Sequence, residues 1–251
     1  MSTKVALNRQ RLKHRIEDFF DSCEERKEAR ALVEALAAQT RAWIFGGMIR
    51  DIGLFGRKGF TSDIDIVIDG NHDVLHRLLS HFHIEQVAVN KLGGVRFSYR
   101  GIDFDIWSLQ ETWAFKNNII EFEEPDSLLK TTLMSWDSVL YDVRRKTVIT
   151  TEYYLNDLHQ KRLELVLPTN PNQAASVVRI LRTIYNKHVE ILGPNLCLFL
   201  SHVLHDYSYE ILQEQEYRSY RSVSFSEGKL DKLIENLHHA KPGCDLKLYF
   251  S

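Results

Sequence analysis

The sequence predicts an α+β fold in which a part that contains a sheet is followed by a helical C-terminal part. Residues 43–69 read as a strand, a glycine turn, a helix, a loop and a second strand. Further strand-like runs follow at 84–89, 94–99 and 102–109, and glycines separate them. From residue 170 onward, apolar residues recur at helical spacing instead, so we expect the remainder of the chain to be helical.

Composition is that of an ordinary soluble globular protein. The chain has 251 residues, of which 44% are hydrophobic and 26% charged, and its net charge of −2 gives no overall signature of nucleic-acid binding. We expect no membrane partner and a cytoplasmic location, because no apolar run could span a bilayer and no hydrophobic signal core follows the basic N-terminus. Cys23, Cys197 and Cys244 fit no zinc spacing and are expected to be reduced thiols.

Three segments are expected along the chain: an N-terminal helical segment at 1–40, a sheet-containing domain at 41–150 and a helical domain at 151–251. One or two helices are predicted between residues 8 and 40. The acidic stretch 111–130 is predicted to be a loop or a mobile segment. The remaining predicted elements are a helix at 74–82, a hairpin at 139–150 and a short helix at 152–160. Three helices are predicted after them: one that begins at Asn170-Pro171, a second over 196–212 and a third over 226–239.

Two glycines and two aspartates in the 43–69 segment suggest a nucleotide site. Gly46 and Gly47 let the backbone turn sharply into a helix, whose N-terminus is suited to binding an anion. Asp63 and Asp65 alternate with isoleucines, so both carboxylates point to one face of their strand. Each feature alone is also typical of a plain turn or a charged surface. Their order on these elements favours a nucleoside triphosphate and Mg²⁺, which binds carboxylates and phosphates.

A third carboxylate is expected from the strand at 102–109. Asp103 and Asp105 lie two residues apart and therefore share a face. We choose Asp105 as the third metal ligand, because Phe104 and Ile106 would then pack behind it. A surface charge at the edge of the sheet is the favoured interpretation of Asp103.

The motifs of this region resemble those of a known family. Residues 46–51 read G-G-M-I-R-D and residues 63–65 read D-I-D. They resemble the G-G-x-x-R-D and D-x-D motifs of the class II CCA-adding enzymes and bacterial poly(A) polymerases, in the DNA polymerase beta-like nucleotidyltransferase superfamily. Asp105 falls where the family's third carboxylate is expected. Other similar segments, over residues 42–190, are K-L-G-G-V-R-F at 91–97, W-D-S-V-L-Y-D at 136–142 and V-R-I-L-R at 178–182.

The resemblance implies a head domain with the nucleotidyltransferase fold, a mixed sheet flanked by helices, followed by a helical neck. Two departures separate the chain from the CCA-adding enzymes themselves. Residues 131–133 read T-T-L where the family has R-R-D. Residues 175–179 read A-S-V-V-R where the family's neck has E-D-x-x-R, so the acidic pair that helps to read a base is missing. We therefore expect a head and neck that serve a purpose other than CCA addition.

The expected reaction transfers NMP from an NTP to an acceptor hydroxyl and releases pyrophosphate. Two Mg²⁺ ions would be held by Asp63, Asp65 and Asp105, and Gly46 and Gly47 would bind phosphates. Three arginines complete the expected site. Arg50 would pair with a phosphate, unless it forms a structural ion pair with Asp51 or Asp69. Arg179 and Arg182 would face the base or the triphosphate, or be structural, and Lys91 or Arg96 could also touch the triphosphate.

The acceptor is left open by the sequence. The resemblance implies an RNA, and a tRNA 3′ end in particular. The near-neutral net charge weakens this expectation, and the basic clusters at 9–15 and 144–146 only partly compensate. Two alternatives remain: transfer to a protein or a small molecule, and a nucleotide- or RNA-binding module without catalysis.

Overall fold

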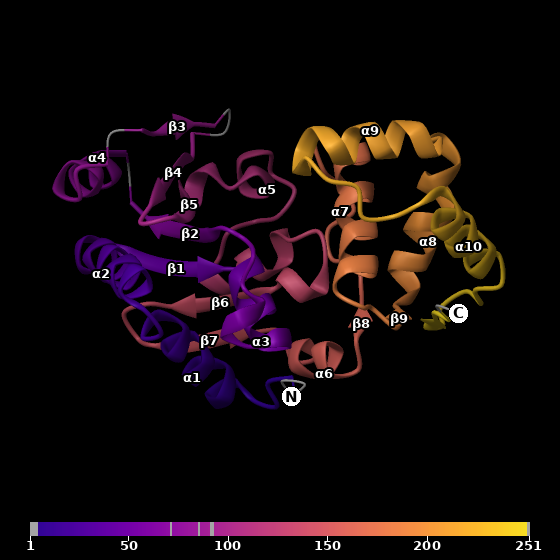
Figure 1. The fold of residues 1–251 in the computed structure, drawn as a ribbon, viewed down its shortest axis with the longest axis horizontal. Coiled ribbons are helices and arrows are strands. Elements are labelled where there is room, and N and C mark those ends of the chain that lie inside the picture. The colour runs from indigo at the N-terminus through magenta and orange to yellow at the C-terminus, as the bar shows by residue number, and fades with distance from the viewer. Residues whose placement is uncertain (1–4, 71, 85, 91–92, 250–251) are drawn as a thin grey trace. The chain divides into compact units, whose positions relative to one another are not determined.

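The computed structural model describes residues 5–70, 72–84, 86–90 and 93–249. The chain divides into two compact units (Figure 1). The first unit comprises residues 1–131 and 136–159, and the second comprises residues 132–135 and 160–251. Among the described residues, no helix combines the length and apolar composition that a membrane crossing requires.

A mixed sheet forms the centre of the first unit, as the sequence predicted. Its strand order within the described ranges is β3-β4-β5-β2-β1-β6-β7. β2 and β5 pair in parallel, and the other neighbours pair antiparallel. The strands are β1 (Arg41–Phe45), β2 (Ile64–Asp69), β3 (Ala88–Val89), β4 (Val95–Tyr99), β5 (Ile102–Ser108), β6 (Val139–Asp142) and β7 (Thr147–Thr150).

Helices cover this sheet and position its strand ends. α1 packs against β7, and α3 packs against β1, β2 and β6, whereas α2 contacts β1, β5 and α4 (Figure 1). The buried face of α1 consists of the apolar residues at its helical spacing, which include Leu12 and Ile16. The helices are α1 (Arg9–Phe20), α2 (Glu24–Gln39), α3 (Gly47–Phe55), α4 (His72–His81), α5 (Trp113–Lys116) and α6 (Tyr154–His159).

The acidic stretch 111–130 is more ordered than predicted, and the loop prediction is wrong near both of its ends, since α5 occupies Trp113–Lys116. A 3-10 helix spans Pro125–Thr131. Leu128 and Leu129 are buried in a cluster with Trp43 and Leu140. Two adjacent leucines are enough to anchor this segment, although acidic residues dominate the sequence before them.

The second unit is helical with a small sheet. Its strands are β8 (Arg162–Leu163), β9 (Ile191–Leu192) and β10 (Leu246–Lys247), and its helices are α7 (Gln173–Asn186), α8 (Pro194–Val203), α9 (Tyr209–Tyr220) and α10 (Glu227–His238). α7 begins later than predicted, because Asn172 rather than Asn170 accepts the capping hydrogen bond, from the Ala175 amide at 3.0 Å. The single helix predicted over 196–212 is wrong, since Tyr207 and Ser208 have extended backbones between α8 and α9.

Candidate active site

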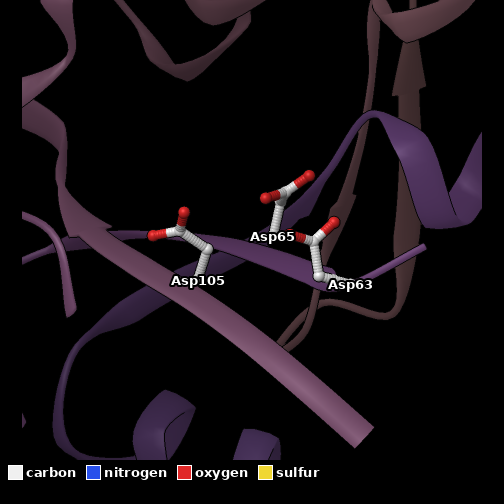
Figure 2. Close-up of side chains that lie close together, drawn as sticks. All are labelled: Asp63, Asp65 and Asp105. Atoms are coloured by element: carbon white, nitrogen blue, oxygen red, sulfur yellow. The ribbon is translucent and has the colours of Figure 1, made fainter. Parts of the chain in front are cut away.

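Strand pairing brings Asp63, Asp65 and Asp105 together, as the sequence predicted. β2 and β5 are parallel neighbours in which Asp65 lies opposite Asp105, and Asp63 directly precedes β2. Figure 2 shows the three side chains on the same side of these two segments. One carboxylate oxygen from each lies within 4.8 Å of the others. The same alternation buries Phe104 and Ile106 completely on the opposite face.

Asp103 does not join this group. It lies opposite Ser98 on the neighbouring strand β4, and its side chain is exposed. Asp103 is therefore the surface charge that was favoured, but it does not lie at the edge of the sheet, because β5 pairs with β4 on one side and with β2 on the other. Asp103 is also a natural comparison residue, because it shares strand β5 with Asp105 but lies outside the cluster.

The three carboxylates fit a divalent cation. Their oxygens are the hard ligands that Mg²⁺ prefers. Asp105 is only 7% exposed, and its Oδ1 atom is buried without a hydrogen-bond partner among the described residues. A buried carboxylate oxygen without a donor is unfavourable, and three negative charges at one place repel each other. A cation bound between the carboxylates would remove both costs.

The glycine turn lies beside these carboxylates at the N-terminus of α3. β1 ends at Phe45, opposite Asp65 of β2, and Gly46 turns the chain with a φ of +62°, a conformation that favours glycine. A Cβ atom on Gly47 would lie 3.6 Å from Ser62 Oγ and 3.9 Å from Asp65 Oδ2. The amide groups that begin α3 therefore adjoin the carboxylates, and a helix N-terminus is suited to binding phosphate.

Arg50 lies in a buried ion-pair cluster under this turn. Its Nε donates to Asp51 Oδ1 at 2.8 Å, and its Nη1 donates to Asp137 Oδ1. Burial alone would lower the pKa of Arg50, but Asp137 and Asp51 reverse this effect and raise the pKa above its usual value. Of the two structural partners considered from the sequence, the structure shows Asp51. Nη2 lies on the side of Gly47, 3.6 Å from where a Cβ atom of that glycine would be.

Asp137 was not identified from the sequence as a partner of Arg50. The two residues are 87 positions apart. Asp137 belongs to the W-D-S-V-L-Y-D segment at 136–142, so the family resemblance marked the segment but not the contact. The side chain of Asp137 is only 3% exposed, which makes the ion pair part of the core of the first unit.

Arg96 is a second arginine at the carboxylates. Its Nη2 donates to Asp105 Oδ2 from the neighbouring strand β4. This hydrogen bond raises the pKa of Arg96, and the charges of Asp105, Asp63 and Asp65 raise it further against the smaller opposing effect of burial. The sequence suggested Arg96 as a contact of the triphosphate but not as a partner of Asp105. Lys91, the other cation suggested there, lies outside the described residues.

Arg179 and Arg182 belong to α7 in the second unit. Arg179 is exposed. Arg182 donates through Nη1 to Glu216 Oε1 at 2.5 Å, and its guanidinium stacks on the ring of Tyr220 at 4.1 Å from the centroid. Glu216 is fully buried, and the sequence gave no signal for this ion pair. Arg182 therefore has the structural contacts that were considered as the alternative to a role at the nucleotide.

No protein-family model matches the sequence. No curated protein matches it either. Solved structures with a similar fold do exist. A tRNA nucleotidyltransferase complexed with a primer tRNA and an incoming ATP analog has 19% identity and a TM-score of 0.56, and the match covers 80% of this chain and 66% of that one.

Two further structures show the same likeness. A CCA-adding enzyme with CTP has 12% identity and a TM-score of 0.62, over 88% of this chain and 53% of that one. The CCA-adding enzyme of Bacillus stearothermophilus in complex with CTP has 16% identity and a TM-score of 0.57, over 76% of this chain and 47% of that one. At these identities the matches show the fold, and they confirm the predicted α+β fold with a mixed sheet flanked by helices. The chain spans between about half and two thirds of the length of these proteins.

Proposed function

We propose that the protein is a metal-dependent nucleotidyltransferase that moves NMP from an NTP to an acceptor hydroxyl and releases pyrophosphate. The observation that carries this proposal is the cluster of Asp63, Asp65 and Asp105 beside the N-terminus of α3. A site for divalent ions next to a site for phosphates is the arrangement that phosphoryl-transfer chemistry requires. The buried Oδ1 of Asp105 supports a bound cation in particular.

Each side chain of the site would have a distinct role. Asp63, Asp65 and Asp105 would hold two Mg²⁺ ions, which activate the attacking hydroxyl and stabilise charge on the phosphates when bound. The amide groups at Gly46 and Gly47 would bind the β and γ phosphates. Arg50 would keep Asp51 and Asp137 as partners through Nε and Nη1 and offer Nη2 to a phosphate oxygen.

The proposed acceptor is an RNA 3′ end, most specifically that of a tRNA, and the reaction would take place in the cytoplasm. The support is the fold shared with a tRNA nucleotidyltransferase that was solved with a primer tRNA and an ATP analog. Arg179, which is exposed on α7, would contact the base or the triphosphate. The acidic residues that accompany this arginine in the CCA-adding enzymes are Ala175 and Ser176 here, so we expect a base preference different from that of CCA addition.

Transfer of radioactive label tests the proposal. The protein is incubated with each α-³²P-labelled NTP, Mg²⁺ and total cellular RNA, and the products are separated by size. Label at tRNA length supports the proposed acceptor, whereas label at protein size or on a small molecule shows a different acceptor. Asp65→Asn and Asp105→Asn should each reduce transfer by about 100-fold or more, because metal-ion stabilisation of the transition state amounts to several kcal/mol.

Asp103→Asn is the matched control for these variants. It removes the same charge from β5, the strand that carries Asp105, but outside the cluster, so transfer should stay within about two-fold of wild type. Undiminished transfer by Asp65→Asn and Asp105→Asn would contradict the proposed mechanism. Equal losses in all three variants would show that net charge matters and that the cluster does not.

A nucleotide-binding module without catalysis is the second candidate. The observations that favour it are in the second unit, where the neck lacks its acidic pair and Arg182 is engaged by Glu216. Mg²⁺-dependent binding of NTP, together with no labelled product after long incubation with RNA, would establish this function instead.

A further inference from the structure

Arg96 belongs to the same row of the sheet as two of the carboxylates. In the strand register, Arg96 of β4 lies opposite Asp105 of β5, and Asp105 in turn lies opposite Asp65 of β2. Residues that lie directly opposite each other on neighbouring strands point to the same face of a sheet. Arg96 therefore flanks the carboxylate cluster through backbone pairing, and its contact with Asp105 does not depend on a flexible loop.

The two partners of this ion pair differ in exposure. The side chain of Asp105 is 10% exposed, whereas that of Arg96 is 60% exposed. The guanidinium thus reaches from solvent onto a nearly buried carboxylate. An exposed arginine gains little net free energy from one ion pair and can exchange its partner readily. Asp105 is fixed in position, and Arg96 is the partner that can move away.

Arg96 and a divalent ion compete for the same carboxylate. Asp105 has two oxygens: Oδ2 accepts from Arg96, and Oδ1 is buried without a hydrogen-bond partner in the described part of the chain. The three carboxylates and the guanidinium together carry a formal charge of −2. One divalent ion neutralises this charge, and a second would create an excess positive charge at the same place. The negative charge of a triphosphate would remove that excess.

We propose that Arg96 controls entry of the second metal ion: it stays on Asp105 until a nucleoside triphosphate draws the guanidinium away, so that the second ion binds only together with the nucleotide. This inference rests on the proposed function, because it assumes that the carboxylates hold metal ions beside a triphosphate. A guanidinium pairs well with phosphate oxygens through two parallel hydrogen bonds, so the released Arg96 has a partner of greater charge than Asp105. Arg96 is thus assigned as a positioning residue for the metals and as a contact of the triphosphate.

Binding of Mn²⁺, counted by electron paramagnetic resonance, tests the first half of this proposal. Without nucleotide, the wild-type protein should bind one Mn²⁺ tightly and a second only when a non-hydrolysable NTP analogue is added. Arg96→Gln should bind the second ion without nucleotide, at least ten-fold more tightly than the wild type does. Arg100→Gln is the matched control, because it removes the same charge from the same hairpin, where Arg100 pairs with Glu28 and not with the cluster. It should behave like the wild type.

Affinity for the nucleotide, measured by calorimetry in the presence of Mn²⁺, tests the second half. Arg96→Gln should weaken binding of the NTP analogue about ten-fold and leave binding of the corresponding nucleoside unchanged, since only the triphosphate replaces Asp105 as a partner. Equal Mn²⁺ binding by the wild type, Arg96→Gln and Arg100→Gln would overturn the inference, and so would an absence of Mn²⁺ binding in all three. These measurements do not depend on label transfer: a protein that transfers no label but shows the Arg96→Gln shift would contradict the proposed function and leave this inference standing.

Discussion

Replacement of Arg50 should destabilise the first unit severely. Arg50, Asp51 and Asp137 have side chains that are 8%, 1% and 3% exposed, so Arg50→Met leaves two carboxylates buried without their common cation. Removing one partner of a buried ion pair costs about 3–5 kcal/mol, because the remaining charge is uncompensated. Arg50→Lys keeps the charge but loses the fork of donors that reaches both carboxylates, and we expect an intermediate loss of about 1–3 kcal/mol.

Urea unfolding followed by tryptophan fluorescence measures this loss in the first unit alone. All four tryptophans of the chain belong to that unit, and Trp43 and Trp136 are 1% and 0% exposed. With a urea dependence of about 2 kcal/mol per molar, a loss of 3–5 kcal/mol lowers the midpoint by about 1.5–2.5 M. Arg57→Met is the control: Arg57 is exposed just beyond α3, so its replacement should change stability by less than about 0.5 kcal/mol. A midpoint for Arg50→Met within about 0.5 M of the control would refute the buried ion-pair cluster.

Three further predictions concern other buried groups. Burial raises the pKa of Cys197 from 9.0 to about 11, so a thiol reagent at pH 8 should label the exposed Cys23 and Cys244 rapidly and Cys197 about 100-fold more slowly. Burial also raises the pKa of Tyr141 from 10.0 to about 12. The contribution of the neutral phenol to the stability of the folded protein is therefore complete below pH 10 and is lost as the pH rises towards 12. Tyr141→Phe should flatten the loss of stability over this pH range, as measured by unfolding followed by fluorescence. Glu216→Ala should destabilise the second unit by about 3 kcal/mol, because it leaves a guanidinium without its fully buried partner. The urea midpoint should fall when unfolding is followed by circular dichroism, which reports both units, and should stay unchanged when it is followed by tryptophan fluorescence, which reports the first unit alone.

The carboxylate cluster was predictable because local patterns determine it. Alternation along a strand decides which face Asp63 and Asp65 share. The same rule makes Asp105 point to one face of the sheet and its neighbour Phe104, which is buried, point to the other. The remaining step is the pairing of β2 with β5, which no local pattern determines and which the register shows. The glycine turn was predictable for a similar reason, since Gly46 has a backbone conformation that other residues rarely adopt.

Asp51 was considered as a partner of Arg50 from the sequence, but the partners of the arginines that lie far away in the sequence were not predictable in this way. Arg50 and Asp137 are 87 positions apart, and Arg182 and Glu216 are 34 apart, so no local spacing connects them. An arginine in a motif can serve a ligand or the protein itself, and only the tertiary contacts distinguish the two. The break between α8 and α9 was missed for another reason: α8 ends at Val203, a 3-10 helix spans Leu204–Asp206, and the chain becomes extended at Tyr207 without a glycine or a proline, the residues that usually mark such a break.

The contrast between Arg50 and Arg96 separates a fixed charge from an exchangeable one within the same unit. The side chain of Arg50 is 8% exposed and is shared by two carboxylates, so removing it from either partner would leave a buried carboxylate without this cation. Within the described part of the chain Arg96 pairs with a single carboxylate, and its side chain is 60% exposed, so water can solvate the guanidinium whenever it leaves Asp105. A ligand that carries several negative charges will therefore draw Arg96 towards itself while Arg50 keeps its place under the glycine turn. Substitution of Arg50 should consequently act mainly on folding, whereas substitution of Arg96 should leave folding intact and act on metal and triphosphate binding.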